Sequence, residues 1–129
     1  MALTEFGKAV RKARIDTGQT LLSMAQALGV SVSFLSAMET GRKKVAASWV
    51  KEIDNFFRKQ GRPVEDLDEL AILANQVAPL DGLPLQQQML VAGFAKSPFT
   101  ADELRAIAEL LGKINADKKN GGETDDPKP

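Results

Sequence analysis

Apolar residues recur every three or four positions along the first part of the chain, which is the period of an α-helix. The first set would occupy one face of a helix and consists of Leu3, Phe6, Val10, Ala13 and Thr17. The basic side chains of the same segment would lie on the opposite face, and they are Lys8, Arg11 and Lys12. Gly18 follows at a position where a helix end favours a residue of positive φ. The pattern therefore predicts an amphipathic helix that ends just before Gly18.

Three further short helices are predicted before residue 62, and residues that favour helix ends separate them. The residues expected to cap helix starts are Thr20 and Ser31, and those expected to end helices are Gly29, Gly41 and Gly61. The apolar faces hold Met24, Ala25 and Leu28, then Phe34, Leu35 and Met38, then Trp49, Val50, Ile53, Phe56 and Phe57. The helical spacing of these aromatic residues favours a core, or a seam with the second half, over a platform for stacking bases.

The second half of the chain is also predicted to be helical, because no segment alternates apolar and polar residues with the period of two typical of strands. One helix is expected over residues 64–77. The helix dipole favours the acidic residues of its first turns, which are Glu65, Asp66, Asp68 and Glu69. Their consecutive positions, without a loop to wrap an ion, favour a solvated face over a cation site. The expected fold class is all-α.

Two more helices are expected after a break that contains proline and glycine. Pro84 suits the first turn of one helix, and Thr100 with Glu103 forms a capping box that opens the other. Residues 117–129 carry no apolar side chain larger than a proline ring, which predicts a disordered tail.

Charge is distributed unevenly along the chain, although the formal net charge is zero with 17 basic and 17 acidic residues. Residues 1–62 contain eleven Lys and Arg against five Asp and Glu, which gives +6. Residues 63–129 contain six against twelve, which gives −6. A basic half joined to an acidic half is typical of a binding module connected to a second module.

The chain contains no Cys, His or Tyr, which limits the chemistry open to it. Disulfides, thiolate metal sites, cysteine nucleophiles, serine–histidine triads and imidazole acid–base catalysis are all excluded. The N-terminal segment is charged from Glu5 and does not have the pattern of a signal peptide, and apolar runs such as residues 89–95 are too short to span a bilayer. We therefore expect a cytoplasmic protein that is not an enzyme and needs no metal or cofactor.

A short helix, a glycine turn, a second short helix and a terminal glycine follow one another between Thr20 and Gly41. Matching residues extend on both sides, and they are Phe6, Val10, Arg14, Met24, Ala25, Leu28, Gly29, Val30, Ser31, Leu35, Ser36, Glu39, Thr40, Gly41 and Arg42. Over residues 4–60 the chain thus resembles the lambda-repressor-like, Cro-type helix-turn-helix family, often called XRE. The resemblance implies an ion pair between Arg14 and Glu39 that ties the first helix to the third. We expect this pair to be structural and not to read bases.

In that family, residues at the start of the third helix read bases, which implies this role for Val32, Ser33, Ser36 and Ala37. Ser can hydrogen-bond ambiguously and Val or Ala can contact a thymine methyl, but none offers a bidentate pair to one base. We therefore expect half-site spacing, DNA shape or arginines outside the motif to contribute to specificity. The alternative is that Val32 and Ala37 are only surface helix formers.

Phosphate contacts are expected from two kinds of group. The helix starts at Thr20 and Ser31 offer backbone N–H donors, and the basic loop of Arg42, Lys43 and Lys44 directly follows the third helix. The alternative for this basic triplet is a solvated loop.

The expected organisation is a five-helix-type, lambda-repressor-like bundle over residues 1–62, a helical dimerisation or regulatory module over residues 63–116, and the tail over residues 117–129. The resemblance implies a homodimer that binds double-stranded DNA at a palindromic operator, with recognition helices about 34 Å apart, and that represses by occupying a promoter. A looser likeness to repressors that a peptidase or antirepressor controls implies a regulatory protein partner. The alternative function is an antitoxin that neutralises a toxin and regulates its own operon.

The residues expected to form the dimer interface line the last two helices, and they are Leu85, Met89, Phe94, Leu104, Ile107, Leu111 and Ile114. A segment of about fifty residues has little interior, so an apolar strip is expected to remain on its surface. Pairing across a two-fold axis would bury that strip. The alternative is that these residues pack onto the basic half of the same chain.

Overall fold

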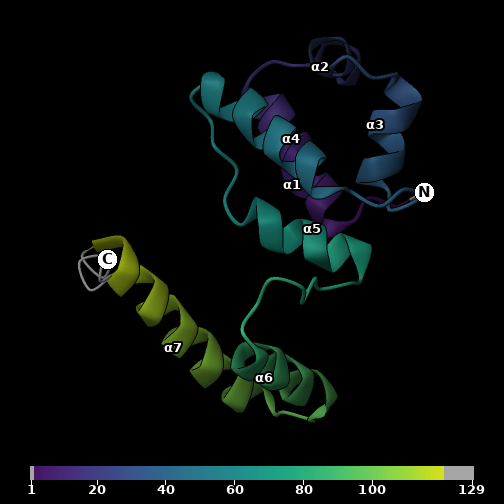
Figure 1. Ribbon diagram of the computed structural model, residues 1–129. Helices are drawn as coiled ribbons and strands as arrows, with labels where there is room; N and C mark the ends of the chain where they lie inside the picture. Colours follow the sequence, from purple (N-terminus) through teal and green to yellow (C-terminus); the bar gives the residue numbers. More distant parts are fainter. Residues whose placement is uncertain (1, 121–129) are drawn as a thin grey trace. The chain divides into compact units, whose positions relative to one another are not determined.

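The computed structural model describes residues 2–120 of the chain, which contain seven α-helices and no strand (Figure 1). In chain order they are α1 (Glu5–Asp16), α2 (Leu21–Leu28), α3 (Val32–Glu39), α4 (Ala47–Lys59), α5 (Leu67–Asn75), α6 (Leu85–Lys96) and α7 (Ala101–Asn120). This confirms the expected all-α class. None of these described helices is by itself long and apolar enough to cross a membrane. The pair of α2 and α3, which is bent by 107°, reaches that length and apolar composition only when the two helices are counted together.

The chain divides into two compact units, and the division differs from the boundary expected after residue 62. Unit 1 is Met1–Pro79 and holds α1 to α5, whereas unit 2 is Leu80–Pro129 and holds α6 and α7. α5 contacts both α1 and α4, and Val64, Leu67 and Ala71 are at most 7% exposed. Because burial of these apolar side chains against α1 and α4 stabilises the bundle, α5 is its fifth helix and does not open a second module.

The core of unit 1 draws apolar side chains from every helix of the unit. The buried residues are Phe6, Val10, Ala13, Met24, Ala25, Leu35, Met38, Val45, Val50, Ile53, Phe57, Val64, Leu67 and Ala71. Trp49 and Phe56 pack half-buried against this core, and the Trp49 ring meets that of Phe34 edge to face at 5.5 Å between centroids. The aromatic cluster is therefore part of the core, as its helical spacing favours.

The helix ends predicted for α1 to α4 are formed by the residues expected for them. Thr20 Oγ1 accepts a hydrogen bond from the Ser23 amide at 2.9 Å, and Ser31 Oγ accepts one from the Phe34 amide at 3.0 Å. Positive φ angles of 71° to 80° occur at Gly18, Gly29, Gly41 and Gly61. α5 is shorter than the predicted helix over 64–77, because the residues on either side of it, Asp66 and Gln76, adopt left-handed backbone conformations.

Unit 2 consists of α6 and α7, and no side chain from Leu80 to Lys119 is buried. The capping box is present: Thr100 Oγ1 accepts from the Glu103 amide at 3.1 Å, and the Glu103 carboxylate accepts from the Thr100 amide at 2.9 Å. α7 continues to Asn120, so the tail expected from residue 117 is helical over 117–120. Lys118 and Lys119 lie in its last turn, where the helix dipole favours cations. The rest of the expected tail, 121–129, lies outside the described residues.

Candidate nucleic-acid interface

α2 and α3 form a helix-turn-helix, with the two helices bent by 107° at the break between them. Gly29 ends α2 with a φ of 75°, and the Val30 amide donates back to the Ala25 carbonyl at 3.0 Å. This hydrogen bond closes the turn in the manner of a Schellman motif. Ala25 is 1% exposed, so its small side chain is buried in the core of unit 1. The turn therefore fixes the direction in which α3 leaves α2.

The structure brings Arg14 of α1 and Glu39 of α3 together as an ion pair, with the guanidinium Nη1 donating to the carboxylate Oε2. The two residues are 7% and 3% exposed, so the pair faces the interior of unit 1 and not a ligand. Burial raises the pKa of the Glu39 carboxyl, and the hydrogen bond from Arg14 opposes this rise. The pair joins α1 to the last turn of α3.

Gly7 also determines how α1 approaches α3, and the sequence pattern does not reveal this. A Cβ atom placed on Gly7 would lie 2.0 Å from the backbone carbonyl oxygen of Glu39. The same oxygen accepts a hydrogen bond from the Thr4 amide at 3.0 Å. The absence of a side chain at Gly7 thus lets the start of α1 contact the end of α3.

The four residues expected to read bases lie on the side of α3 that faces away from the core. Val32 is 36% exposed and Ser33 is exposed, whereas Ser36 and Ala37 are half-buried. The opposite side of α3 carries Leu35 and Met38, which are fully buried. These four residues form an accessible strip along α3, in which Val32 and Ser33 are the most exposed.

Thr20 and Ser31 each use the side-chain oxygen to cap a helix, because these atoms accept from the Ser23 and Phe34 amides. Each hydroxyl oxygen thus accepts within the protein, while its O–H remains a donor on an exposed residue. The backbone N–H groups of the first helical turns and these O–H groups are the donors that the two sites can offer to a phosphate.

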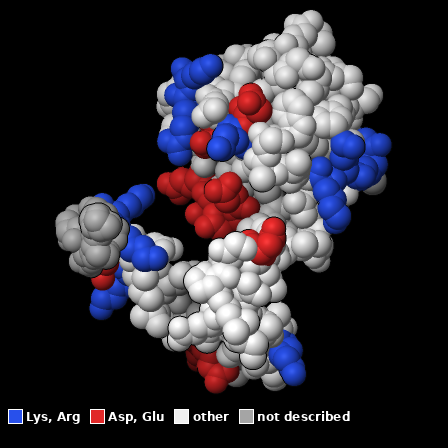
Figure 2. All heavy atoms as spheres, viewed as in Figure 1, with Lys and Arg blue, Asp and Glu red and all other residues white. Residues whose placement is uncertain are grey.

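The basic loop after α3, defined as Arg42, Lys43 and Lys44, is exposed at all three positions. Figure 2 shows basic side chains gathered on the side of unit 1 where α3 ends. Arg42 Nε donates to Thr40 Oγ1 at 3.3 Å, and the Lys43 ammonium lies 5.3 Å from the centroid of the Phe34 ring. Both contacts involve residues of α3 or its C-cap, so these two cations lie beside the helix expected to read bases.

Lys44 differs from its two neighbours, because its ammonium reaches α5. Lys44 Nζ donates to the backbone carbonyl of Asn75 at 2.7 Å. Asn75 is the last residue of α5, where unpaired carbonyls attract cations. The expected phosphate contact of Lys44 therefore competes with a contact inside unit 1.

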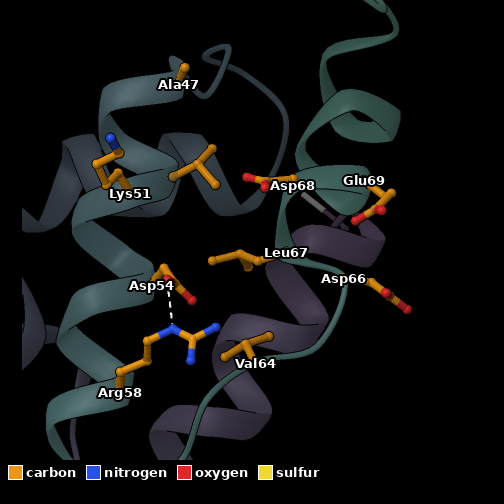
Figure 3. Close-up of a pocket in the computed structure, with 10 residues that line it drawn as sticks. Ala47, Lys51, Asp54, Arg58, Val64, Asp66, Leu67, Asp68 and Glu69 are labelled. Atoms are coloured by element: carbon orange, nitrogen blue, oxygen red, sulfur yellow. Dashed lines mark hydrogen bonds and ion pairs between the residues drawn. The ribbon is translucent and has the colours of Figure 1, made fainter. Parts of the chain in front are cut away.

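The acidic residues near the start of α5 line a cavity of about 390 Å³ between α4 and α5. In Figure 3, Asp68 points toward α4, whereas Asp66 and Glu69 point away from it, and Asp54 pairs with Arg58 at 2.8 Å. The carboxylates do not converge on one point, and no group of acidic side chains in the described residues could hold a metal ion. These acids form a solvated face, as the sequence favours.

Comparison with protein families assigns residues 5–70 to the helix-turn-helix domain family. The matched segment contains α1 to α4 and the first part of α5. It covers just over half of the 129-residue chain, and the protein belongs to this family of DNA-binding domains. Comparisons with curated proteins and with solved structures gave no match.

Proposed function

We propose that this protein is a sequence-specific transcriptional repressor that binds a palindromic operator as a homodimer. The observation that carries the proposal is the accessible strip of α3, with the exposed cations of Arg42 and Lys43 beside it. The strip would enter the major groove, and the two cations and the helix starts would contact phosphates on its edges. Repression would follow from occupancy of a promoter and would require no chemistry.

The exposed apolar surface of unit 2 supports the homodimer. The side chains expected at the interface are 37% to 74% exposed, and they are Leu85, Met89, Phe94, Leu104, Ile107, Leu111 and Ile114. Water contact on this many large apolar side chains is unfavourable, and a second copy offers the same apolar surface across a two-fold axis. Pairing would also supply the second helix-turn-helix that a palindrome requires.

The DNA contact is tested with Ser36→Glu, which places a negative charge on the proposed groove strip. The matched control is Asn55→Glu, which adds the same charge on an exposed position of α4. Duplexes selected from a random pool by the wild-type protein serve as the specific probe. We expect Ser36→Glu to lose specific binding with an unchanged melting temperature, and Asn55→Glu to bind normally. Normal binding by Ser36→Glu would show that α3 does not dock in the groove.

The dimer is tested in the full-length chain by sedimentation. Leu111→Glu places a charge on the proposed interface, whereas Ala106→Glu adds one at another exposed position of α7. We expect the first variant to be monomeric and to bind operator much more weakly, and the second to remain a dimer. A dimeric Leu111→Glu variant would contradict this interface.

An antitoxin is the second candidate, and the apolar groove of unit 2 favours it. A cavity of about 620 Å³ is lined by apolar residues of both helices, including Met89, Phe94, Ile107 and Leu111. A toxin could cover this groove in place of a second copy. Co-expression with the neighbouring open reading frame distinguishes the two, because an antitoxin would copurify with a small partner protein.

A further inference from the structure

Asn75, at the end of α5, holds the loop that connects α3 to α4. Its side-chain Oδ1 accepts a hydrogen bond from the Val45 amide at 2.8 Å, and its Nδ2 donates to the Val45 carbonyl at 3.0 Å. One side-chain amide thus satisfies both backbone groups of a residue thirty positions earlier in the chain. Among side chains in their neutral-pH forms, only the amides of Asn and Gln carry a donor and an acceptor on one carbon atom.

The position of Val45 makes these two hydrogen bonds significant. Val45 directly follows the basic loop, and it is 2% exposed. The buried side chain fixes where Val45 lies, but it does not by itself set the orientation of the peptide planes on either side. Hydrogen bonds to both the N–H and the C=O set that orientation. Within the loop, the Lys43 amide donates to the Ala37 carbonyl of α3 at 3.1 Å.

Lys44 adds a third bond to the same residue. Its ammonium donates to the backbone carbonyl of Asn75 at 2.7 Å, which directs this side chain toward α5. Arg42 and Lys43 remain on the α3 side, through the Thr40 hydroxyl and the Phe34 ring. The backbone is therefore held at Lys43, within the loop, and at Val45, directly after it, with two of the loop's three cations beside α3.

We propose that Asn75 is a positioning residue for DNA binding, which holds the basic loop so that Arg42 and Lys43 meet phosphates beside the groove that α3 enters. This inference rests on the proposed function, because it assigns those two cations to DNA. Without Asn75 the loop would sample other conformations, and each binding event would have to order it again. The role of Asn75 is indirect, since its amide is occupied by Val45.

The test measures binding to a short mixed-sequence duplex by fluorescence anisotropy at several salt concentrations. Asn75→Ala removes both hydrogen bonds, and Asn55→Ala is the matched control at an exposed position of α4. We expect Asn75→Ala to weaken binding roughly tenfold and to lower the salt slope by about one unit, because one phosphate contact is lost on average. Asn55→Ala should bind as the wild type does.

A double-mutant cycle separates positioning from general destabilisation. If Asn75 acts through the loop, Arg42→Ala should cost less in the Asn75→Ala background than in the wild type. All titrations are made well below the melting temperature of each variant. If Asn75→Ala does not fold, Asn75→Ser takes its place, since a hydroxyl can replace one of the two hydrogen bonds. Additive effects of Asn75 and Arg42, or unchanged affinity with a lowered melting temperature, would overturn the inference.

Hydrogen exchange of the Val45 amide tests the hydrogen bonds without DNA. We expect this amide to exchange faster in Asn75→Ala while the amides of α3 stay protected. Faster exchange with unchanged DNA affinity would reject the positioning role and leave the proposed function intact. A wild-type protein that binds no duplex at low salt would reject the proposed function and this inference with it.

Discussion

The contact between Gly7 and the end of α3 makes Gly7→Ala an informative substitution. The new Cβ would lie 2.0 Å from the carbonyl oxygen of Glu39 and 2.8 Å from its carbonyl carbon, and both are backbone atoms. The oxygen is held by the Thr4 amide at 3.0 Å, and the Glu39 side chain is held by Arg14. Neither partner can move aside alone, so α1 and α3 would have to separate.

The expected loss of stability follows from opposing contributions. In an exposed helix, Gly→Ala stabilises by about 1 kcal/mol because glycine loses more backbone entropy on folding. An overpacked contact costs about 1 to 3 kcal/mol, and more when only backbone can yield. A weakened Thr4–Glu39 hydrogen bond adds about 1 kcal/mol. We expect a net loss near 3 kcal/mol, which lowers the melting temperature of a domain this small by roughly 15 °C.

The assay uses the fluorescence of Trp49 during urea and thermal unfolding. Trp49 is the only tryptophan in the chain and packs against Phe34 within unit 1, so its signal reports on this unit. Gly112→Ala in α7 is the matched control, because the Cβ that it would add meets nothing within 4 Å beyond its chain neighbours and the adjacent backbone of α7. The control should leave the Trp49 transition unchanged. A Gly7→Ala variant as stable as the wild type would refute the close contact between α1 and α3.

The buried pair of Arg14 and Glu39 should act as a unit in urea titrations. Arg14→Met leaves Glu39 unpaired and should lower the unfolding free energy by about 3 to 5 kcal/mol. Adding Glu39→Leu to Arg14→Met should restore most of the lost unfolding free energy. Equal losses in the single and double variants would contradict this. Hydrogen bonds from Arg62 and Lys12 lower the pKa of Asp16 below 3.8, so its contribution to stability is present above that pH and is lost as the pH falls through the folded pKa. Asp16→Asn should therefore flatten the acid side of a stability–pH profile, and an unchanged profile would reject the Asp16 contribution. Arg42→Ala should weaken binding to all duplexes alike and lower the salt slope by about one unit. The control Lys51→Ala, at an exposed position, should change neither. An altered sequence preference with an unaltered salt slope would overturn the phosphate contact of Arg42.

Local signals in the sequence were sufficient for the caps of α2 and α3 and for the capping box of α7. Ser31 reaches an amide three residues later, and Thr100 and Glu103 cap each other over the same distance. Gly29 adopts a positive φ without help from a distant neighbour. These interactions lie within a single turn, so the order of residues along the chain determines them.

The candidate site was predictable in part. The family resemblance located α3 and the basic loop, and it implied the pair of Arg14 and Glu39, which lie 25 positions apart. The chemistry of a lysine does not specify its partner, and the contact of Lys44 with Asn75 depends on where α5 ends in space. The sequence therefore grouped Lys44 with Arg42 and Lys43, while the structure separates it from them.

Only the tertiary structure decided that α5 belongs to the DNA-binding unit and that Gly7 is a contact point. An apolar face with Val64, Leu67 and Ala71 can be buried by either half of the chain, and the helical period is the same in both cases. Gly7 is an ordinary glycine in a helix until the backbone of Glu39 lies beside it. Helical periodicity specifies which side of a helix is apolar, whereas the free energy gained by burial depends on which distant segment covers that side.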